Sequence, residues 1–338
     1  MMVVGRRFIL CGVLTIFMLS PASAKDPGAT LIVKESWSGV FGGRQQIFHI
    51  EVSSEDAIAG RVGWSYQVES RVLRRAEVAV KLDAGAVQVI EVALDVAEVK
   101  PGVIVESALQ ASLFVKGHAD ALATFEKPIR VFSTDPFMGR TKWLNDLNIQ
   151  LFDPEESTAD VFDQAKVSVS VVHSVDALSG IEDGMLVVGE GVSLFDYRGL
   201  SKEMINLAAR GVPVLCLAPS EGEMTLPGVG SSELPMPRGM LFRSNDMITE
   251  LDKRLDAAVW PPGGRIKAGM FALRGARGPV TGVLGDESGG WPWVEMFFEA
   301  DRSNFLLCGF PVMDGWESGP TPRYLFVELL EHVTARDR

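Results

Sequence analysis

The chain has 338 residues, of which 47% are hydrophobic and 22% are charged, and its formal net charge is −12. These proportions are typical of a globular protein with a large core and exclude a disordered or fibrous chain. Because binding to nucleic-acid phosphates requires clustered Lys and Arg, the acidic balance argues against a nucleic-acid partner. At about 100–200 residues per domain, the length predicts roughly two domains.

The first 24 residues have the organisation of a secretory signal peptide. Arg6-Arg7 precede an apolar run over 8–19, and Ala22-Ser23-Ala24 provide the small residues that a signal peptidase accepts. We therefore expect cleavage before Lys25 and a periplasmic or secreted protein. The apolar run is shorter than the roughly 20 residues of a membrane-spanning helix. No membrane span is expected once the signal is removed.

From residue 25 to 133 the sequence has the period of β-strands. Around Phe48, Ile50 and Val52 the apolar residues occupy every second position, which is typical of a strand with one buried face. Turn signals such as Gly42-Gly43 and Pro101-Gly102 separate these runs. Because no helical pattern interrupts about 100 residues, we predict an all-β immunoglobulin-like sandwich over 25–133.

The pattern changes after residue 133, and Ser133-Thr134-Asp135-Pro136 is the predicted hinge. A helical spacing covers 140–151, an apolar strand covers 184–189, a helix covers 200–210 and another strand covers 212–218. Continuous apolar runs are typical of parallel strands that are buried on both faces. The alternation of strands and helices predicts a doubly wound, flavodoxin-like α/β domain over 134–338.

Two of the three cysteines, Cys216 and Cys308, remain after the signal is removed. Both lie in apolar runs that we expect to form strands. An exported protein can hold one disulfide, and two buried free thiols fit the apolar surroundings as well. The sequence leaves both states open.

Ligands of open α/β sheets collect at the carboxyl ends of the strands. The candidate binding residues that follow the predicted strands are Glu190, Ser220, Glu221, Asp314 and Trp316. None of the four histidines is among them, so no nucleophile has a recognisable base. Since metal-ligand spacings such as His-x-x-x-His and Cys-x-x-Cys are also absent, we predict no catalytic residue, no metal and no cofactor.

One group of carboxylates and one group of tryptophans each have a carbohydrate-processing interpretation and a structural one. Carboxylates near one another can serve a glycosidase, but neighbouring glycines favour a polar loop here. Tryptophans can stack on sugar rings, but flanking Pro and Gly residues favour positions at the edge of the core. The groups are Asp286, Glu287, Glu295 and Glu299, and Trp291, Trp293 and Trp316.

Three segments resemble class I glutamine amidotransferase-like domains: Val187-Val188-Gly189-Glu190-Gly191, Ala208-Ala209-Arg210-Gly211 and Val212-Pro213-Val214-Leu215-Cys216-Leu217-Ala218. In the catalytic members of this family, the strand that is entered through Gly-x-Pro-Val leads to a cysteine at a sharp strand-to-helix elbow. Counting from Pro213 places that cysteine at Ala218, while Cys216 comes two residues earlier and Pro219-Ser220-Glu221 replaces the glycine-rich elbow. No His-x-Glu follows near the last strand. The resemblance therefore implies a domain that lacks the nucleophile and the triad.

The end of the chain, over 305–312 and 316–330, resembles noncatalytic amidotransferase-like domains of secreted bacterial proteins. In those proteins an immunoglobulin-like sandwich often precedes the domain. The resemblance implies an exported, noncatalytic binding or scaffolding protein with a protein partner or a small polar or carbohydrate ligand. The alternative is a carbohydrate-processing or other hydrolase accessory that uses an acidic strand-end cleft. Because fold alone does not carry function, the site must decide between them.

Overall fold

The structure is a computed structural model that describes residues 28–227, 233–244, 246–257, 271–275, 278–284, 293–299 and 304–335. The predicted signal peptide (1–24), Asp286, Glu287 and Trp291 lie outside the described residues. Within the described ranges, the helices are all too short or too polar to cross a membrane.

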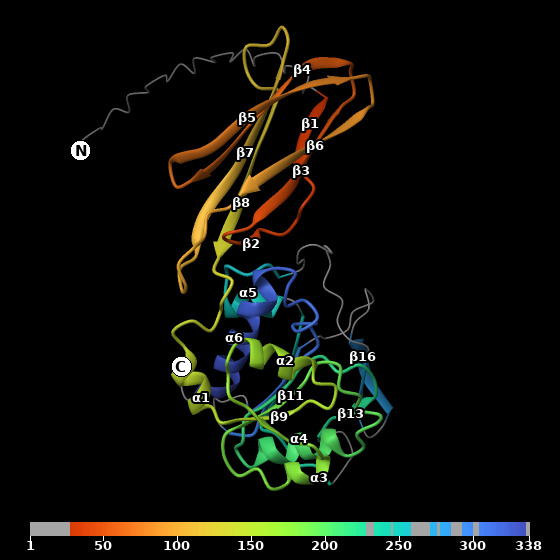
Figure 1. The fold of residues 1–338 in the computed structure, drawn as a ribbon. Coiled ribbons are helices and arrows are strands. Elements are labelled where there is room, and N and C mark those ends of the chain that lie inside the picture. Colours follow the sequence, from red (N-terminus) through yellow and green to blue (C-terminus); the bar gives the residue numbers. More distant parts are fainter. Residues whose placement is uncertain are drawn as a thin grey trace, which may run out of the picture.

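The first part of the chain is a two-layer β-sandwich (Figure 1). One sheet is antiparallel and has the order β1-β3-β6, with β1 (Ala29–Val33), β3 (Gln45–Ser54) and β6 (Val87–Asp95). The other has the order β2-β8-β7-β4-β5, with β2 (Gly39–Phe41), β4 (Ile58–Val68), β5 (Arg71–Leu82), β7 (Val105–Val115) and β8 (Ala123–Phe132). The all-β sandwich that the sequence predicts for this part is confirmed.

The alternation along β3 explains why this strand forms here. Phe48, Ile50 and Val52 are fully buried between the sheets, while the intervening residues point outward. Phe48 also contacts the Trp37 ring, with 5.1 Å between the ring centroids. Burial of one face of each sheet therefore supplies the sandwich core.

The second part of the chain contains a seven-stranded sheet of order β10-β9-β11-β12-β18-β17-β14. The first five strands are mutually parallel, β17 is antiparallel to β18, and β14 is antiparallel to β17. The strands are β9 (Ile149–Phe152), β10 (Ser170–Val171), β11 (Met185–Val188), β12 (Val214–Cys216), β14 (Gly239–Arg243), β17 (Trp293–Phe297) and β18 (Phe305–Cys308). A smaller sheet contains β13 (Glu223–Thr225), β15 (Phe271–Gly275) and β16 (Gly278–Leu284).

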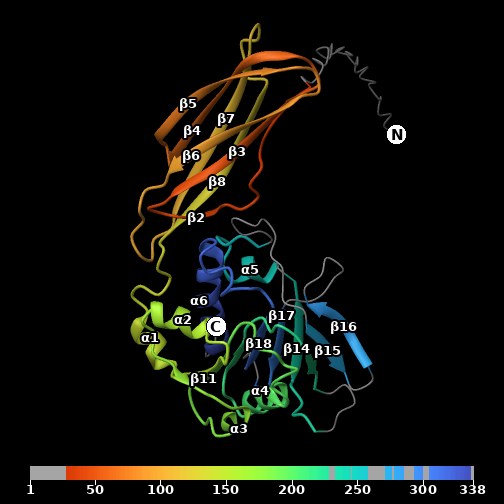
Figure 2. The ribbon, with the colours of Figure 1, turned by 45° about the vertical axis from the view of Figure 1, so that its right-hand side comes forward.

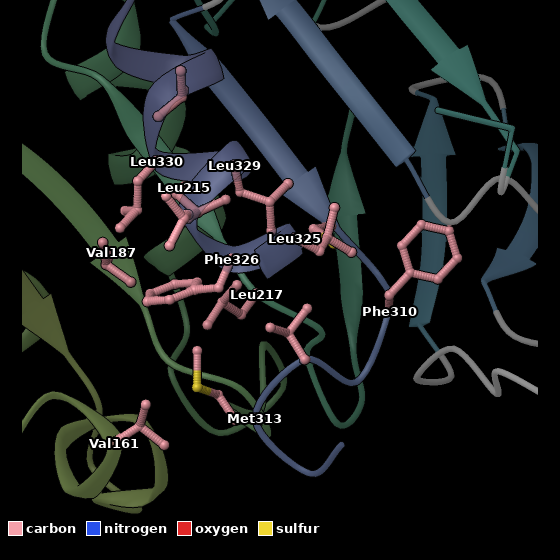
Figure 3. Packing of buried hydrophobic residues seen from close by; sticks show 14 of the residues in the cluster. Val161, Val187, Leu215, Leu217, Phe310, Met313, Leu325, Phe326, Leu329 and Leu330 are labelled. Carbon is pink, nitrogen blue, oxygen red and sulfur yellow. The ribbon is translucent and has the colours of Figure 1, made fainter. Parts of the chain in front are cut away.

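Helices cover both faces of the seven-stranded sheet. Leu215 of β12 packs into a core with α1, α2, α5 and α6, whereas Val214 and Cys216 pack into a second core with α3 and α4. Figure 3 shows Leu215 and Val187 of the strands against Leu329 of α6. The helices are α1 (Thr141–Asp146), α2 (Ser157–Gln164), α3 (Val175–Leu178), α4 (Leu200–Ala209), α5 (Asp246–Leu251) and α6 (Pro320–Thr334). The finer assignment to a flavodoxin-like fold remains a prediction.

The helix predicted over 140–151 is wrong in its second half. The helix α1 ends at Asp146, Asn148 has a left-handed φ of 47°, and residues 149–152 form the parallel strand β9 beside β11. Apolar residues in a short run fit either period, and burial of Ile149 and Leu151 in the sheet decides for the strand. As a result Asp153, directly after β9, becomes a further strand-end residue.

The sandwich and the α/β part are joined by direct contacts at the predicted hinge. The Asp256 carboxylate accepts hydrogen bonds from the backbone N–H groups of Ser38 (2.9 Å) and Gly39 (2.7 Å) in the sandwich. The Tyr324 hydroxyl of α6 donates to the Ser133 carbonyl oxygen at 3.2 Å. Figure 2 shows α5 and α6 on the side of the α/β part that faces the sandwich. The hinge is therefore packed rather than free.

Candidate functional site at the carboxyl ends of the strands

Glu190 bridges two loops at the carboxyl edge of the sheet. It follows β11, and its carboxylate accepts hydrogen bonds from the backbone N–H groups of Met313 (2.7 Å) and Asp314 (2.9 Å), which follow β18. Because β12 lies between β11 and β18 in the sheet, the Glu190 side chain spans the end of β12. Its own N–H donates to the Thr158 hydroxyl at 2.9 Å. Glu190 and Asp314 are thus brought together as the sequence predicts.

The environment of Glu190 changes its acidity. Burial raises the pKa of Glu190 to about 7, the backbone hydrogen bonds from Met313 and Asp314 oppose the increase, and the Asp314 charge adds to it. A carboxyl group with a pKa near neutrality has the acidity that a general acid or base needs. Both oxygen atoms are nevertheless bound to main-chain N–H groups. The geometry is that of a brace between loops.

Asp153 is a strand-end residue that the sequence analysis missed. Its Oδ2 accepts hydrogen bonds at 2.8 Å from the N–H groups of Thr158 and Ala159, at the beginning of α2. Its Oδ1 is buried and has no partner among the described residues. Burial raises the pKa of Asp153, and the two N–H bonds oppose the increase. A strand assignment for 149–152 would have placed Asp153 beside Glu190 from sequence.

Ser220 and Glu221 lie on an exposed loop after β12. The Ser220 N–H donates to the Val192 carbonyl at 3.3 Å, and the Glu221 carbonyl accepts from the Leu194 N–H at 2.9 Å. The Glu221 side chain accepts a hydrogen bond from the Ser193 hydroxyl at 3.4 Å. These contacts fix the loop against 192–194, whereas the Glu190 carboxylate is directed to the loop after β18.

Trp316 lies beside the hinge and lines a groove between the hinge, α2 and the loop before α6. Its side chain is buried, with 8% of the residue exposed. Its ring stacks on Phe137 with 5.9 Å between centroids and meets Phe326 edge-on. The Arg323 guanidinium lies 5.4 Å from the Trp316 ring centroid. Trp316 therefore packs mostly against the core beneath the hinge and contributes its remaining exposed surface to this groove.

The position of the missing nucleophile is buried. Ala218 is 5% exposed, and Cys216 and Cys308 are fully buried free cysteines. Of the two states that the sequence leaves open, the structure has the free thiols rather than a disulfide. Burial raises the pKa of the Cys216 thiol to about 12 and raises that of Cys308 as well. Because the thiolate is the nucleophilic form, neither cysteine is prepared for covalent chemistry.

Glu295, one of the carboxylates with a possible glycosidase role, is a core residue of β17. Glu295 is 1% exposed and accepts hydrogen bonds from the Trp293 indole and from His332 Nε2, the latter at 3.1 Å. Trp293 is itself fully buried, and Glu299 is exposed. In the part of the chain that the structure describes, no group of three or more His, Cys, Asp and Glu side chains is arranged to hold a metal ion.

Two grooves on the surface have the size of a small ligand. One has a volume of about 560 Å³ and lies between the hinge, α2 and the loop before α6; its lining includes Asp135, Met138, Lys166 and Glu317. The other has a volume of about 540 Å³ and lies on the outer face of the five-stranded sheet, where it is lined mainly by β4, β5 and β7.

No protein-family model matches the sequence, and no curated protein matches it. Among solved structures, the sporulation control protein Spo0M from Bacillus subtilis is similar over 35% of this chain and 55% of its own, at 13% identity and a TM-score of 0.25. A CARDB domain from Pyrococcus furiosus, in complex with di-metal ions, is similar over 32% of this chain and 94% of its own, at 14% identity and a TM-score of 0.23. A cycloisomaltooligosaccharide glucanotransferase from Paenibacillus sp. is similar over 56% of this chain and 28% of its own, at 11% identity and a TM-score of 0.26. The chain therefore spans about half the length of the first of these proteins, and similarities at these TM-scores assign no function to it.

Proposed function

We propose that this chain is an exported, noncatalytic binding or scaffolding protein. In this proposal an immunoglobulin-like sandwich precedes a flavodoxin-like α/β domain that is a degenerate relative of class I amidotransferase-like domains. The observation that carries the proposal is the combination of the pKa and the hydrogen bonds of the Glu190 carboxyl group. Its pKa is suited to proton transfer, but both of its carboxylate oxygens are bound to the N–H groups of Met313 and Asp314.

The residues around Glu190 support the noncatalytic half of the proposal. Ala218 stands where the catalytic relatives carry a cysteine, and it has no side-chain group that reacts. Cys216 is buried in β12 with a raised pKa. Hydrolysis by a nucleophile requires an activated side chain next to a base; the Ser193 hydroxyl, 3.4 Å from the Glu221 carboxylate, is mostly buried, with 8% of the residue exposed.

The groove at the junction supports the binding half of the proposal. Ligand sites occur preferentially between domains and combine an apolar surface with a few polar groups. Met138, with 54% of its surface exposed, supplies apolar surface in this groove. Asp135, Lys166 and Glu317 supply charges of both signs around it. This combination suits a small polar ligand or a polar segment of a protein partner.

Turnover assays test the noncatalytic assignment. Wild type, Glu190→Gln and, as the matched control, Glu221→Gln should show no hydrolysis of glutamine or of glycoside and ester model substrates above the uncatalysed rate. Robust turnover by wild type and the control that disappears in Glu190→Gln would replace the proposal by the hydrolase alternative. Export is tested separately by mass spectrometry of the protein from the producing cell, which should begin at or near Lys25.

A carbohydrate-processing accessory is the second candidate, and the groove on the five-stranded sheet favours it. Gly63 of β4 lies between Glu77 and Ser112 of the neighbouring strands, and Ser65 lies between Arg75 and Gln110. The floor is therefore made of small residues, while the sides carry donors and acceptors that suit a hydroxyl-rich ring.

Filling this groove tests the second candidate. A Cβ at Gly63 would meet its nearest atom, on Phe114, at 3.8 Å, so Gly63→Ala fits and Gly63→Leu obstructs the groove. Calorimetry with cellohexaose, xylohexaose and maltohexaose should then show binding by wild type and Gly63→Ala and none by Gly63→Leu. Absence of binding to all three by wild type removes the support that this groove gives.

A further inference from the structure

The strand β5 is an open edge of the five-stranded sheet. In the order β2-β8-β7-β4-β5 it pairs with β4 on one side, and no described strand pairs with its other side. At 12 residues it is the longest strand of the sandwich. The free N–H and C=O groups of such an edge are a template for another strand.

The first half of β5 is exposed on both of its faces. All seven residues over 71–77 are exposed, whereas Val80 and Leu82 farther along are buried by the opposite sheet. Val72 and Leu73 consequently have 50% and 47% of their surface in water, although both are apolar. Both residues lie at the shift in register between β4 and β5, so the regular part of the open edge runs from Arg74 to Leu82.

The strand is held in a position from which it can pair. The Arg74 side chain crosses to β6 and donates hydrogen bonds at 3.0 Å to the Ala93 carbonyl and the Asp95 carboxylate. This contact ties β5 to the other sheet and leaves the outer edge of the backbone uncovered. Figure 2 shows β5 at the outer margin of the sandwich.

We propose that β5 pairs antiparallel with β5 of a second copy of this chain, about a two-fold axis through Ala76. In this register Arg75 of each copy lies opposite Glu77 of the other, so that two opposite-charge pairs form. Arg74 then lies opposite Val78, and the regular pairing ends before Leu73, where the register between β4 and β5 shifts. The paired segment therefore runs over 74–78 of each copy and places no like charges opposite each other.

The charges select this register over its neighbours. A two-fold axis perpendicular to the sheet pairs residues of equal parity, because opposed side chains share a face. An axis through Arg75 would place two arginines opposite each other, and an axis through Glu77 would place two glutamates opposite each other. Cationic residues on an edge commonly oppose pairing, but here Glu77 makes the strand complementary to itself.

The small area of this contact limits the affinity of the dimer. One pair of strands buries less than the roughly 1,600 Å² of a standard interface. The dimer should therefore form in a concentration-dependent manner and join two five-stranded sheets into one. Glu77 already has Arg61 of its own chain at 3.4 Å. Since both of these side chains are more than half exposed, the Glu77 carboxylate remains accessible to the second copy's Arg75.

Sedimentation velocity of the mature chain over a concentration series tests the proposal. Wild type should dimerise, and Arg75→Glu and Glu77→Arg should each weaken the dimer by about tenfold or more, because each creates two like-charge pairs. The double variant Arg75→Glu/Glu77→Arg restores opposite charges and should restore the dimer. Glu91→Arg, at an exposed glutamate of β6 in the other sheet, should leave association unchanged.

Each possible outcome decides the proposal. A wild-type chain that stays monomeric at all concentrations overturns it, as does a dimer that tolerates both single reversals. A double variant that associates as weakly as the single variants overturns the register through Ala76. Circular dichroism of each variant establishes that the sandwich remains folded, which we expect because both side chains are on the surface.

Discussion

The guanidinium group of Arg323 lies over the Phe41 ring, 4.7 Å from its centroid, and so links the first turn of α6 to β2 of the sandwich. Its N–H groups also donate to the Trp316 carbonyl at 2.7 Å and to the Thr134 carbonyl at 2.6 Å. Only 9% of the Arg323 side chain is exposed. One buried cation thus connects the sandwich, the hinge and the α/β part.

Replacement of Arg323 by Ala should destabilise the protein by about 3 kcal/mol, because buried carbonyl oxygens lose charge-assisted donors. Arg323 also pairs with the Glu317 carboxylate at 2.6 Å. Arg44 is the matched control, since it contacts the same Phe41 ring and the same carboxylate but is half exposed. Arg44→Ala should cost less than about 1 kcal/mol. Urea denaturation of both variants measures the difference, and equal costs would contradict the role given to Arg323.

The Glu190 carboxyl should make stability depend on pH. Its pKa in the folded protein is about 7, against an ordinary value of 4.5, so the folded state holds the proton more tightly than the unfolded state. The contribution is therefore fully present below pH 4.5 and is lost as the pH rises through 7. The difference is up to about 3 kcal/mol.

Glu190→Gln carries no titrating group at this position and should lose that part of the pH dependence. Denaturation of wild type and variant across pH 4.5 to 7 measures the difference between their slopes. Ser220→Ala, on the exposed loop after β12, changes no titrating group and should keep the wild-type slope. Identical slopes for wild type and Glu190→Gln would show that the carboxyl titrates normally.

Gly189 should not tolerate a side chain. A Cβ at this position would lie 2.3 Å from Oδ1 of the buried Asp153, and Asp153 cannot withdraw without releasing the N–H groups at the beginning of α2. We expect Gly189→Ala to cost about 1–3 kcal/mol. Gly63→Ala, whose new Cβ would make ordinary van der Waals contacts with Phe114 and Glu77, should be close to neutral. Thermal unfolding of both variants distinguishes a steric effect from a general effect of losing glycine.

The two thiols should be unreactive in the folded protein. Cys216 and Cys308 are fully buried, and burial raises the pKa of both. Alkylation of the native mature chain at mildly alkaline pH should be slow, and denaturation should release both thiols. Ser220→Cys, at an exposed position after β12, should react at once. Fast labelling of wild type would point instead to an accessible cysteine.

Much of the secondary structure could be predicted because it depends on near neighbours in the sequence. The alternation at Phe48, Ile50 and Val52 identified β3, and the predicted helix over 200–210 corresponds to α4, at Leu200–Ala209. The strand predicted over 184–189 corresponds to β11. The strand β9 was missed because Leu151 continues the helical spacing of Leu144 and Leu147, and the pairing of β9 with β11 comes from elsewhere in the chain.

The candidate site could be predicted only in part for the same reason. Glu190 and Asp314 were placed together because parallel strands end at one edge of a sheet. The bonds of the Glu190 carboxylate to main-chain N–H groups, and the burial of Trp316 against Phe137, depend on the paths of loops. No local pattern encodes these paths.

The sequence by itself determined the alternation of buried and exposed residues, and with it the sandwich, the strand β11 and the helix α4. The hydrophobic effect buries one face of each strand or helix, and the resulting periodicity involves only a few consecutive residues. It can therefore be recognised from the sequence alone. Only the tertiary structure decided that Arg323 meets Phe41, that Asp153 caps α2 beside Gly189, and that β5 is left at an open edge. Each of these features depends on how segments that are distant in the sequence pack together. Close packing couples the positions of all these segments, so no short stretch of sequence determines the contacts.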